Sequence, residues 1–241
     1  MYNSTAPLVD KLITTKSGAL FDLDGLMVPS LDLWVQTDAE YFKLHGIHIA
    51  DPDALHREKL QIMKKYTAEP NMWAVVYSEW NKKYGIPLTG ERGLAMVMKM
   101  VSEKQARLGL KDGVAKTLHR LKSQDFKLGI VTATNRSSLD TYKDKNEIIK
   151  KAADFNKIFG ENILTTEDFE NKTHGYLMMQ EMLGLNKEDY IIFEDSPAGV
   201  EEAVVTGIDT VAVYDKFWKD DLPQIEQMTP YRINSFEELQ I

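Results

Sequence analysis

Two aspartates separated by one residue follow a short apolar run near the start of the chain. The run 19–21 predicts a buried strand, and Asp22 and Asp24 come directly after it. Side chains two residues apart in a strand point to the same face. Two carboxylates on one face repel each other unless a cation or a proton lies between them. This spacing therefore predicts a cation or proton site at the end of the strand.

Polar residues also follow other apolar runs that predict strands. A strand predicted over 127–132 ends in Thr132, and the run 190–193 is followed by Glu194 and Asp195. Ligands of parallel sheets lie beyond the carboxyl ends of the strands, and these ends meet at one edge of the sheet. We therefore expect these side chains to lie near the aspartate pair.

The acids at these strand ends suit phosphoryl chemistry with a metal. Asp22 and Asp195, with Glu194 as a third candidate, offer the hard oxygen ligands that Mg²⁺ takes in proteins. A carboxylate can attack phosphorus to form an aspartyl-phosphate. A second carboxylate two residues further on, Asp24, could protonate the leaving oxygen and then activate a water molecule. The acids therefore predict phosphoryl transfer with Mg²⁺ as the cofactor.

Three further residues could hold the phosphate, although each also has an ordinary structural interpretation. Thr132 offers a hydroxyl, the turn that begins at Ala133 offers backbone N–H groups, and Lys172 offers a point charge. Taken alone, Thr132 is a strand-end residue and Lys172 a solvated lysine. Ser196 and Pro197 are typical of a helix start, which leaves the two acids before them unexplained. Acids at two strand ends with a hydroxyl at a third favour the functional interpretation.

The rest of the chain predicts the elements that position these residues. Between 30 and 107 the apolar residues recur at helical spacing, which predicts an inserted helical bundle of its own. In 108–241 predicted strands alternate with helices, which predicts an α/β core with a doubly wound parallel sheet, completed by residues 1–29. We interpret 1–16 as a short polar lead-in and 135–156 as helical and solvated.

Composition narrows the classes of partner. The chain has 241 residues, with 29 Lys and Arg against 37 Asp and Glu, so its formal net charge is −8. This charge disfavours nucleic acid as a partner, because nucleic-acid binding needs a basic surface. No apolar run approaches the about 18 residues of a membrane span, and there is no cysteine. We expect a cytoplasmic monomer or weak dimer with no membrane or nucleic-acid partner and a small phosphorylated substrate.

Several stretches resemble the motifs of one family. The chain contains ALFDLDG at 19–25, GIVTATNR at 129–136 and YIIFEDSPAGVEEAVVTG at 190–207. In order and spacing they resemble the haloacid dehalogenase superfamily, in the branch of small phosphatases and phosphomutases with a helical cap. The resemblance covers nearly the whole chain, with the helical insert where that branch places its cap.

The resemblance implies a role for each matching residue. Asp22 would be the nucleophile and a magnesium ligand. Asp24 would be the general acid and base, with its backbone carbonyl at the metal. The phosphate-binding residues would be Thr132, Ala133 and Lys172, and the remaining magnesium ligands would be Glu194 and Asp195.

Three departures from the family pattern bear on the reaction. Pro29 stands where relatives often have an acid, and Lys172 is followed by Thr-His-Gly where relatives usually have Pro-x-Pro. The sugar phosphomutases carry a histidine twelve residues after the nucleophile, and here that position is Trp34. We therefore expect a magnesium-dependent phosphomonoester hydrolase acting on a small sugar or polyol phosphate. The alternatives are a phosphomutase, a metal-free dehalogenase, or a catalytically idle binding protein on the same scaffold.

Overall fold

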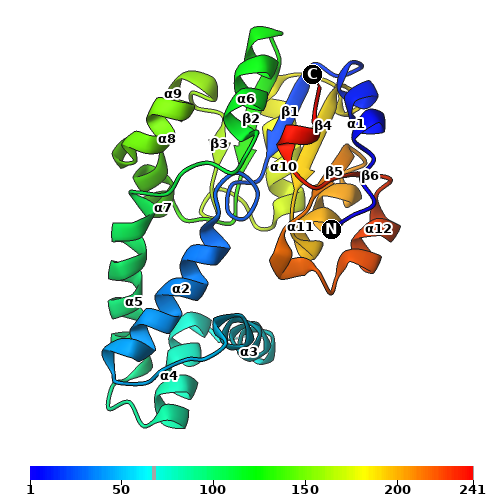
Figure 1. The fold of residues 1–241 in the computed structure, drawn as a ribbon. Coiled ribbons are helices and arrows are strands. Elements are labelled where there is room, and N and C mark those ends of the chain that lie inside the picture. The colour runs from blue at the N-terminus through cyan, green and yellow to red at the C-terminus, as the bar shows by residue number, and fades with distance from the viewer. Residues whose placement is uncertain (67–68, 241) are drawn as a thin grey trace. The chain divides into compact units, whose positions relative to one another are not determined.

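The computed structural model describes residues 1–66 and 69–240 and contains one six-stranded sheet (Figure 1). The strand order is β3-β2-β1-β4-β5-β6, and every neighbouring pair is parallel. The strands are β1 Gly18–Phe21, β2 Lys127–Val131, β3 Ile163–Leu164, β4 Tyr190–Glu194, β5 Asp209–Val213 and β6 Tyr231–Ile233. The predicted doubly wound parallel sheet is confirmed.

Helices cover both faces of the sheet in the unit formed by residues 1–29 and 107–241, which we call the core unit. Its α-helices are α1 Ala6–Ile13, α6 Val114–Ser123, α7 Arg136–Asp140, α8 Glu147–Ala152, α9 Phe155–Ile158, α10 Lys172–Leu183, α11 Pro197–Val205 and α12 Leu222–Met228. It also contains the π-helical turn η1 Thr141–Lys145 and the 3-10 helices η2 Lys187–Asp189, η3 Lys216–Trp218 and η4 Phe236–Glu238. This alternation of strand and helix makes the unit an α/β fold.

Successive side chains of a strand point to opposite faces of the sheet. Phe21 and Phe193 stack with ring centroids 5.0 Å apart on the face covered by α1 and α6. Leu20 points to the other face, where it packs with residues of α10 and α11. On that face a Cβ at Gly129 would lie 2.8 Å from Met179 of α10. Glycine at this position of β2 therefore allows α10 to pack closely against the sheet.

Two expectations about the core unit need correction. Residues 1–16 are not a polar lead-in, because they contain α1, whose Ala6, Val9 and Ile13 are buried against the sheet. The segment 135–156 is helical as predicted, but it is not simply solvated. The apolar residues that it buries are Leu139, Tyr142, Ile149, Ala153 and Phe155.

Residues 30–106 form a second unit of helices, which we call the helical unit. Its helices are α2 Ser30–Leu44, α3 Pro52–Lys65, α4 Met72–Tyr84 and α5 Gly90–Gln105. Asp51 caps α3 by accepting a hydrogen bond from the Ala54 N–H at 2.9 Å, and Gly85 ends α4 in the left-handed conformation. Arg107 belongs to the core unit, whereas the range expected from the sequence ended the insert at 107.

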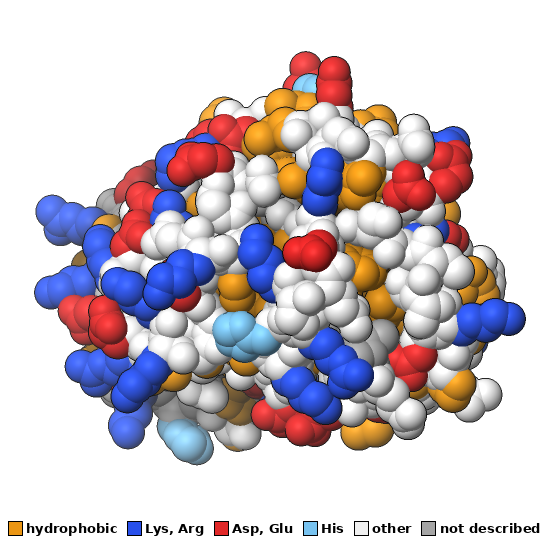
Figure 2. All heavy atoms as spheres, turned by 90° about the horizontal axis from the view of Figure 1, so that it is seen from above, with side chains coloured by type: hydrophobic (Ala, Val, Ile, Leu, Met, Phe, Trp, Pro, Cys, Tyr) orange, Lys and Arg blue, Asp and Glu red, His pale blue; other side chains and the backbone are white. Residues whose placement is uncertain are grey.

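One face of the protein is mixed in charge (Figure 2). Figure 2 shows one face of the protein, where acidic and basic side chains are interspersed with hydrophobic ones. Among the described residues, no helix is both long enough and apolar enough to cross a membrane.

Candidate active site

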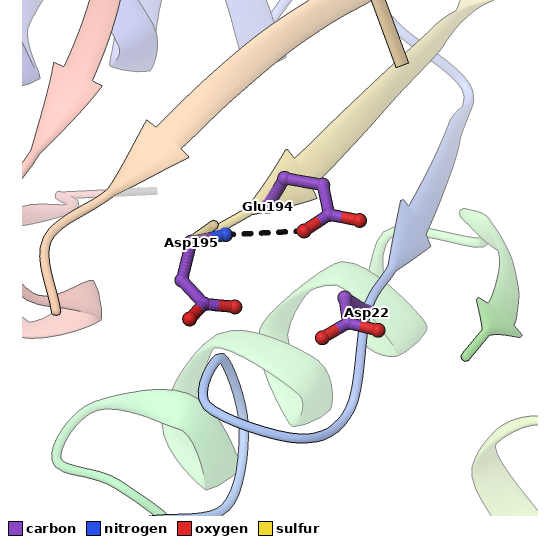
Figure 3. A group of neighbouring side chains, drawn as sticks. All are labelled: Asp22, Glu194 and Asp195. Atoms are coloured by element: carbon purple, nitrogen blue, oxygen red, sulfur yellow. Dashed lines mark hydrogen bonds between the residues drawn. The ribbon is translucent and has the colours of Figure 1, made fainter. Parts of the chain in front are cut away.

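Three buried carboxylates meet beyond the ends of β1 and β4 (Figure 3). Parallel pairing of Phe21 with Phe193 aligns the two strands, so Asp22, directly after β1, lies beside Glu194, the last residue of β4. One oxygen from each of Asp22, Glu194 and Asp195 lies within 4.8 Å of the others. The structure therefore brings together the three acids that the sequence placed at separate strand ends.

Lys172 lies between two of these acids. Its Nζ is 2.6 Å from Asp22 Oδ1 and also donates a hydrogen bond to Glu194 Oε1. Lys172 is the first residue of α10, and Asn171 caps that helix by accepting the His174 N–H at 2.9 Å. This helix start stands where relatives usually have Pro-x-Pro. A Cβ at Gly175 would lie 2.7 Å from Val131 and Phe169, so glycine lets the first turn pack against β2.

Glu194 is held from several sides and has no exposed surface. The Tyr176 hydroxyl donates to Glu194 Oε1 at 2.6 Å, and the Asp195 N–H donates to Oε2 at 3.2 Å. A Cβ at Gly199 would clash with Glu194 Oε2, so only glycine at this position of α11 leaves room for the carboxylate. Tyr176 was missed as a site residue, because in the sequence it is one more apolar position of a helix.

Asp195 differs from Glu194 because one of its oxygens is left unsatisfied. Its Oδ2 accepts the Trp218 indole N–H at 3.2 Å. Its Oδ1 is buried and accepts no hydrogen bond from any residue that the structure describes. A buried carboxylate oxygen without a donor is costly unless a cation satisfies it. The donor set of three carboxylates with one orphaned oxygen thus fits a hard divalent cation such as Mg²⁺.

The electrostatics of the cluster also favour a cation. Three carboxylates against one lysine give a formal charge of 3 × (−1) + 1 = −2. Burial, reinforced by the Glu194 charge and opposed by Lys172, raises the pKa of Asp22 to about 7. Burial and the Asp22 charge raise the pKa of Asp195 well above its usual range. Burial disfavours the charged form of Lys172, but Asp22 and Glu194 more than offset this and raise its pKa. A divalent cation among these acids would lower the carboxylate pKa values again.

Asp24 has a different environment from the other acids. Its Oδ1 accepts a hydrogen bond from the Tyr142 hydroxyl at 3.1 Å. Tyr142 is fully buried and belongs to the π-helical turn η1, a kind of turn that is frequent at functional sites. Tyr142 was missed because its segment looked solvated, and its apolar neighbours are too few to show a stripe. The contact fixes one oxygen of the residue expected to act as acid and base.

Thr132 and Ala133 directly follow β2, the strand next to β1. Thr132 is buried, and its Oγ1 accepts the Thr134 N–H at 3.1 Å, which closes a tight turn. Ala133 is exposed at the tip of this turn. The two residues therefore lie at the expected edge of the sheet, and their phosphate-binding role stays a prediction.

Comparison with known families agrees with the motifs. The sequence profile of a family described as "Haloacid dehalogenase-like hydrolase" matches residues 19–213. This range begins at the strand before Asp22 and ends with β5, so it contains every candidate site residue. No protein with a curated description matches the chain.

Solved structures with the same fold cover almost the whole chain. A Thermotoga maritima protein described as a beta-phosphoglucomutase is 21% identical, with a TM-score of 0.73, covering 92% of this chain and 96% of its own. A Bacillus subtilis protein, YfnB, described as a HAD-hydrolase and bound to magnesium, is 17% identical, with a TM-score of 0.70 and coverages of 92% and 96%. A Haemophilus somnus protein described as a phosphoglycolate phosphatase is 17% identical, with a TM-score of 0.69 and coverages of 92% and 95%. At these identities the likeness concerns the fold.

Proposed function

We propose that this chain, which belongs to the haloacid dehalogenase-like hydrolases, is a magnesium-dependent phosphomonoester hydrolase. The observation that carries the proposal is the convergence of Asp22, Glu194 and Asp195 around Lys172 at one edge of the sheet. The magnesium found in the Bacillus subtilis structure and the phosphatase description of the Haemophilus somnus protein support the same chemistry.

The metal would be held by oxygen ligands at the ends of β1 and β4. Asp22 and Asp195 would each supply a carboxylate oxygen, and Asp24 would supply its backbone carbonyl. Glu194, already engaged by Tyr176 and by Lys172, would act directly or through water. When bound, Mg²⁺ supplies positive charge that neutralises the acids and the phosphoryl group.

Asp22 would be the nucleophile. Its carboxylate oxygen would bond to phosphorus while the bond from phosphorus to the ester oxygen breaks, which gives an aspartyl-phosphate. Lys172, 2.6 Å from Asp22, favours the ionised form that this attack needs. Thr132, Ala133 and Lys172 would hold the phosphoryl oxygens.

Asp24 would move the protons. In the first step its carboxylic acid donates a proton to the departing alcohol oxygen. In the second step the resulting carboxylate takes a proton from a water molecule, which attacks phosphorus and releases inorganic phosphate from Asp22. The hydrogen bond from Tyr142 to Asp24 Oδ1 would orient the carboxyl group for this proton exchange. Because neither carboxylate is consumed, the enzyme returns to its starting state.

The substrate would be a small phosphorylated metabolite of the sugar or polyol phosphate class, and the protein a cytoplasmic monomer or weak dimer. With 29 basic against 37 acidic residues, the chain has no overall positive charge to attract a polyanion, and this supports a small ligand held by a few local positive groups. Lys172 and the backbone N–H groups after Thr132 would supply that charge.

The proposal is tested by phosphate release from a panel of small phosphomonoesters and an aryl phosphate. The assay is run with Mg²⁺, with chelator, and with Asp22→Asn as the blank. We expect release that needs Mg²⁺ and is absent from the variant. Conversion between sugar-phosphate isomers without phosphate release would favour the phosphomutase alternative. Absence of both reactions would favour a binding protein on this scaffold.

A further inference from the structure

We propose that Trp218 restricts Asp195 to one ligand oxygen and thereby makes the metal site select Mg²⁺ over Ca²⁺. The inference rests on the proposed metal site. It adds a positioning residue that lies outside the motifs and that the family resemblance does not assign. The two metals differ in a way that such a residue can use. Ca²⁺ takes six to eight oxygen ligands and often binds carboxylates through both oxygens, whereas Mg²⁺ requires six ligands in near-ideal octahedral geometry.

The two oxygens of Asp195 are in different situations. Oδ2 accepts the Trp218 indole N–H at 3.2 Å, while Oδ1 is buried without a donor among the described residues. An oxygen already engaged by an indole N–H is a poor second ligand. Asp195 is therefore prepared to bind a cation through Oδ1 alone, which suits Mg²⁺.

The carboxylate of Asp195 also has little room to turn. A Cβ built on Gly25 would lie 2.5 Å from Asp195 Oδ2, so the backbone after Asp24 packs directly against this oxygen. Asp195 has 2% of its surface exposed. Rotation that would present both oxygens to a larger cation is thus opposed by the Gly25 backbone on one side and by Trp218 on another.

A chain of hydrogen bonds links the helix that carries Trp218 to the loop after Asp24. We call its members, Gly25, Lys111, Asp215 and Trp218, the bracket. Asp215 caps the short helix η3, because its Oδ1 accepts the Phe217 N–H at 2.9 Å. Its Oδ2 accepts a hydrogen bond from Lys111 Nζ at 3.0 Å, and the same Nζ donates to the Gly25 carbonyl at 2.6 Å. The bracket joins the loop after the nucleophile to the helix that carries Trp218.

The backbone of Lys111 and the side chain of Trp218 add to this support. The Lys111 N–H donates to the Met27 carbonyl at 2.8 Å, so Lys111 is tied twice to the loop after Asp24. The indole of Trp218 packs against the buried group of Tyr2, Val200, Ala212 and Ile225. Trp218 is thus held by packing and by a capped helix, and its N–H is aimed at the metal ligand.

The test compares Mg²⁺ and Ca²⁺ affinities of the full chain by titration calorimetry. Trp218→Phe keeps an aromatic ring for packing and removes the N–H. We expect the preference for Mg²⁺, expressed as the ratio of the Ca²⁺ to the Mg²⁺ dissociation constant, to fall about tenfold, the lower end of the effect of removing a partner of a metal ligand. Trp73→Phe is the matched control, because Trp73 is a partly exposed tryptophan of the helical unit. It should leave the ratio unchanged.

A second variant tests the bracket without altering the ring. Asp215→Asn keeps a side chain that can cap η3 and removes the charge that pairs with Lys111. We expect the ratio to move in the same direction by about threefold, less than in Trp218→Phe because the N–H donor is kept. Thermal unfolding of each variant checks that the fold is retained.

The outcomes separate this inference from the proposed function. If the unaltered protein binds Mg²⁺ and both variants keep its metal ratio, the role of Trp218 is overturned while the metal site stands. If the unaltered protein binds no Mg²⁺, the metal site and the role of Trp218 are both overturned. A fall in the ratio in Trp218→Phe and Asp215→Asn, with no change in Trp73→Phe, supports the proposal.

Discussion

In each of the two units a buried carboxylate accepts hydrogen bonds from a lysine and from a tyrosine hydroxyl, but the two clusters carry different charge. In the helical unit, Lys59 Nζ lies 2.8 Å from Asp38 Oδ2, and the Tyr77 hydroxyl donates to Oδ1 at 2.7 Å. We call Asp38, Lys59 and Tyr77 the balanced cluster, because one acid meets one base. In the core unit Lys172, Glu194 and Tyr176 make the same pattern.

The core cluster adds Asp22 and Asp195 to that pattern, and we call it the acidic cluster. Its formal charge is −2, whereas the balanced cluster is neutral. The pKa values of the two lysines shift in opposite directions. Burial lowers the pKa of Lys59, and Asp38 only partly offsets this. For Lys172, burial is outweighed by Asp22 and Glu194, which raise its pKa.

The groups that surround the two lysines also differ: aromatic rings surround Lys59, and excess acids surround Lys172. Lys59 lies over aromatic rings, 4.4 Å from the Trp34 centroid and 5.0 Å from that of Trp73. Such rings stabilise a cation without adding net charge, so the balanced cluster needs no further ion. The acidic cluster has an oxygen without a donor and a surplus of negative charge. The comparison teaches that a lysine with matched acids is electrostatically complete, whereas acids in excess of the lysine leave the charge that the proposed metal would neutralise.

The largest expected effect is on turnover, from Asp22→Asn. Loss of the nucleophile should lower kcat on the order of 10⁶-fold, as in other enzymes with covalent intermediates. It should leave the fold intact, because it removes one charge from an acidic cluster. Steady-state phosphate release measures kcat, and thermal unfolding checks the fold. Turnover within tenfold of the unaltered enzyme would remove Asp22 from the reaction.

Replacing each lysine by methionine should separate the clusters by stability. Lys59→Met leaves Asp38 buried without its cation, which should cost about 3–5 kcal/mol of the free energy of unfolding. Lys172→Met should cost less when Mg²⁺ is present, because the cation replaces the lost charge, and it should abolish most turnover. Urea denaturation with Mg²⁺ and with chelator measures the loss of stability in both variants, and phosphate release measures turnover. Equal losses of stability, unaffected by Mg²⁺, would contradict the distinction between the clusters.

The acidic cluster should also give metal-free protein an unusual pH dependence. The pKa of Asp22 rises from 3.8 to about 7 on folding, so between these values the folded state binds more protons than the unfolded state. Stability due to Asp22 is therefore present at low pH and is lost as pH rises through about 7. The difference in unfolding free energy between the unaltered protein and Asp22→Asn, measured with chelator, should show this fall. Mg²⁺ should suppress it, and a difference that is independent of pH would contradict the account.

The smallest effect concerns two tyrosine hydroxyls. Tyr142→Phe should lower kcat about tenfold with little change in KM, because Asp24 loses a hydrogen bond that helps to orient it. The matched change Tyr77→Phe removes a hydroxyl from the balanced cluster and should cost about 2 kcal/mol of stability without lowering kcat. Steady-state kinetics gives kcat for each variant, and urea denaturation gives its free energy of unfolding. A loss of kcat in Tyr77→Phe equal to that in Tyr142→Phe would show that hydroxyl loss acts through stability alone.

The strand ends of the active site could be predicted from the sequence for a clear reason. Short apolar runs such as 190–193 give strands buried on both faces, and polar residues after them fall at the edge where parallel strands bind ligands. Ser196 caps α11 as predicted, by accepting the Gly199 N–H at 3.1 Å. Local rules of this kind depend only on neighbours in the chain.

The supporting residues could not be predicted, because their contacts join distant parts of the chain. Tyr142 meets Asp24 across 118 positions, and Trp218 meets Asp195 from a helix that follows a different strand. Nothing in the sequence near Lys111 indicates that its Nζ donates a hydrogen bond to the Gly25 carbonyl in the folded chain. The strand β6 has three residues, too few to show a period.

The most direct test of the central claim asks where the phosphoryl group goes. The enzyme is mixed with Mg²⁺ and an aryl phosphate, quenched in acid within one turnover, and digested for mass spectrometry. We predict one added phosphoryl group on the peptide that contains Asp22, and none in a parallel digest of Asp22→Asn. Phosphate release without any labelled peptide, or a label on another residue, would contradict the assignment of Asp22 as the nucleophile.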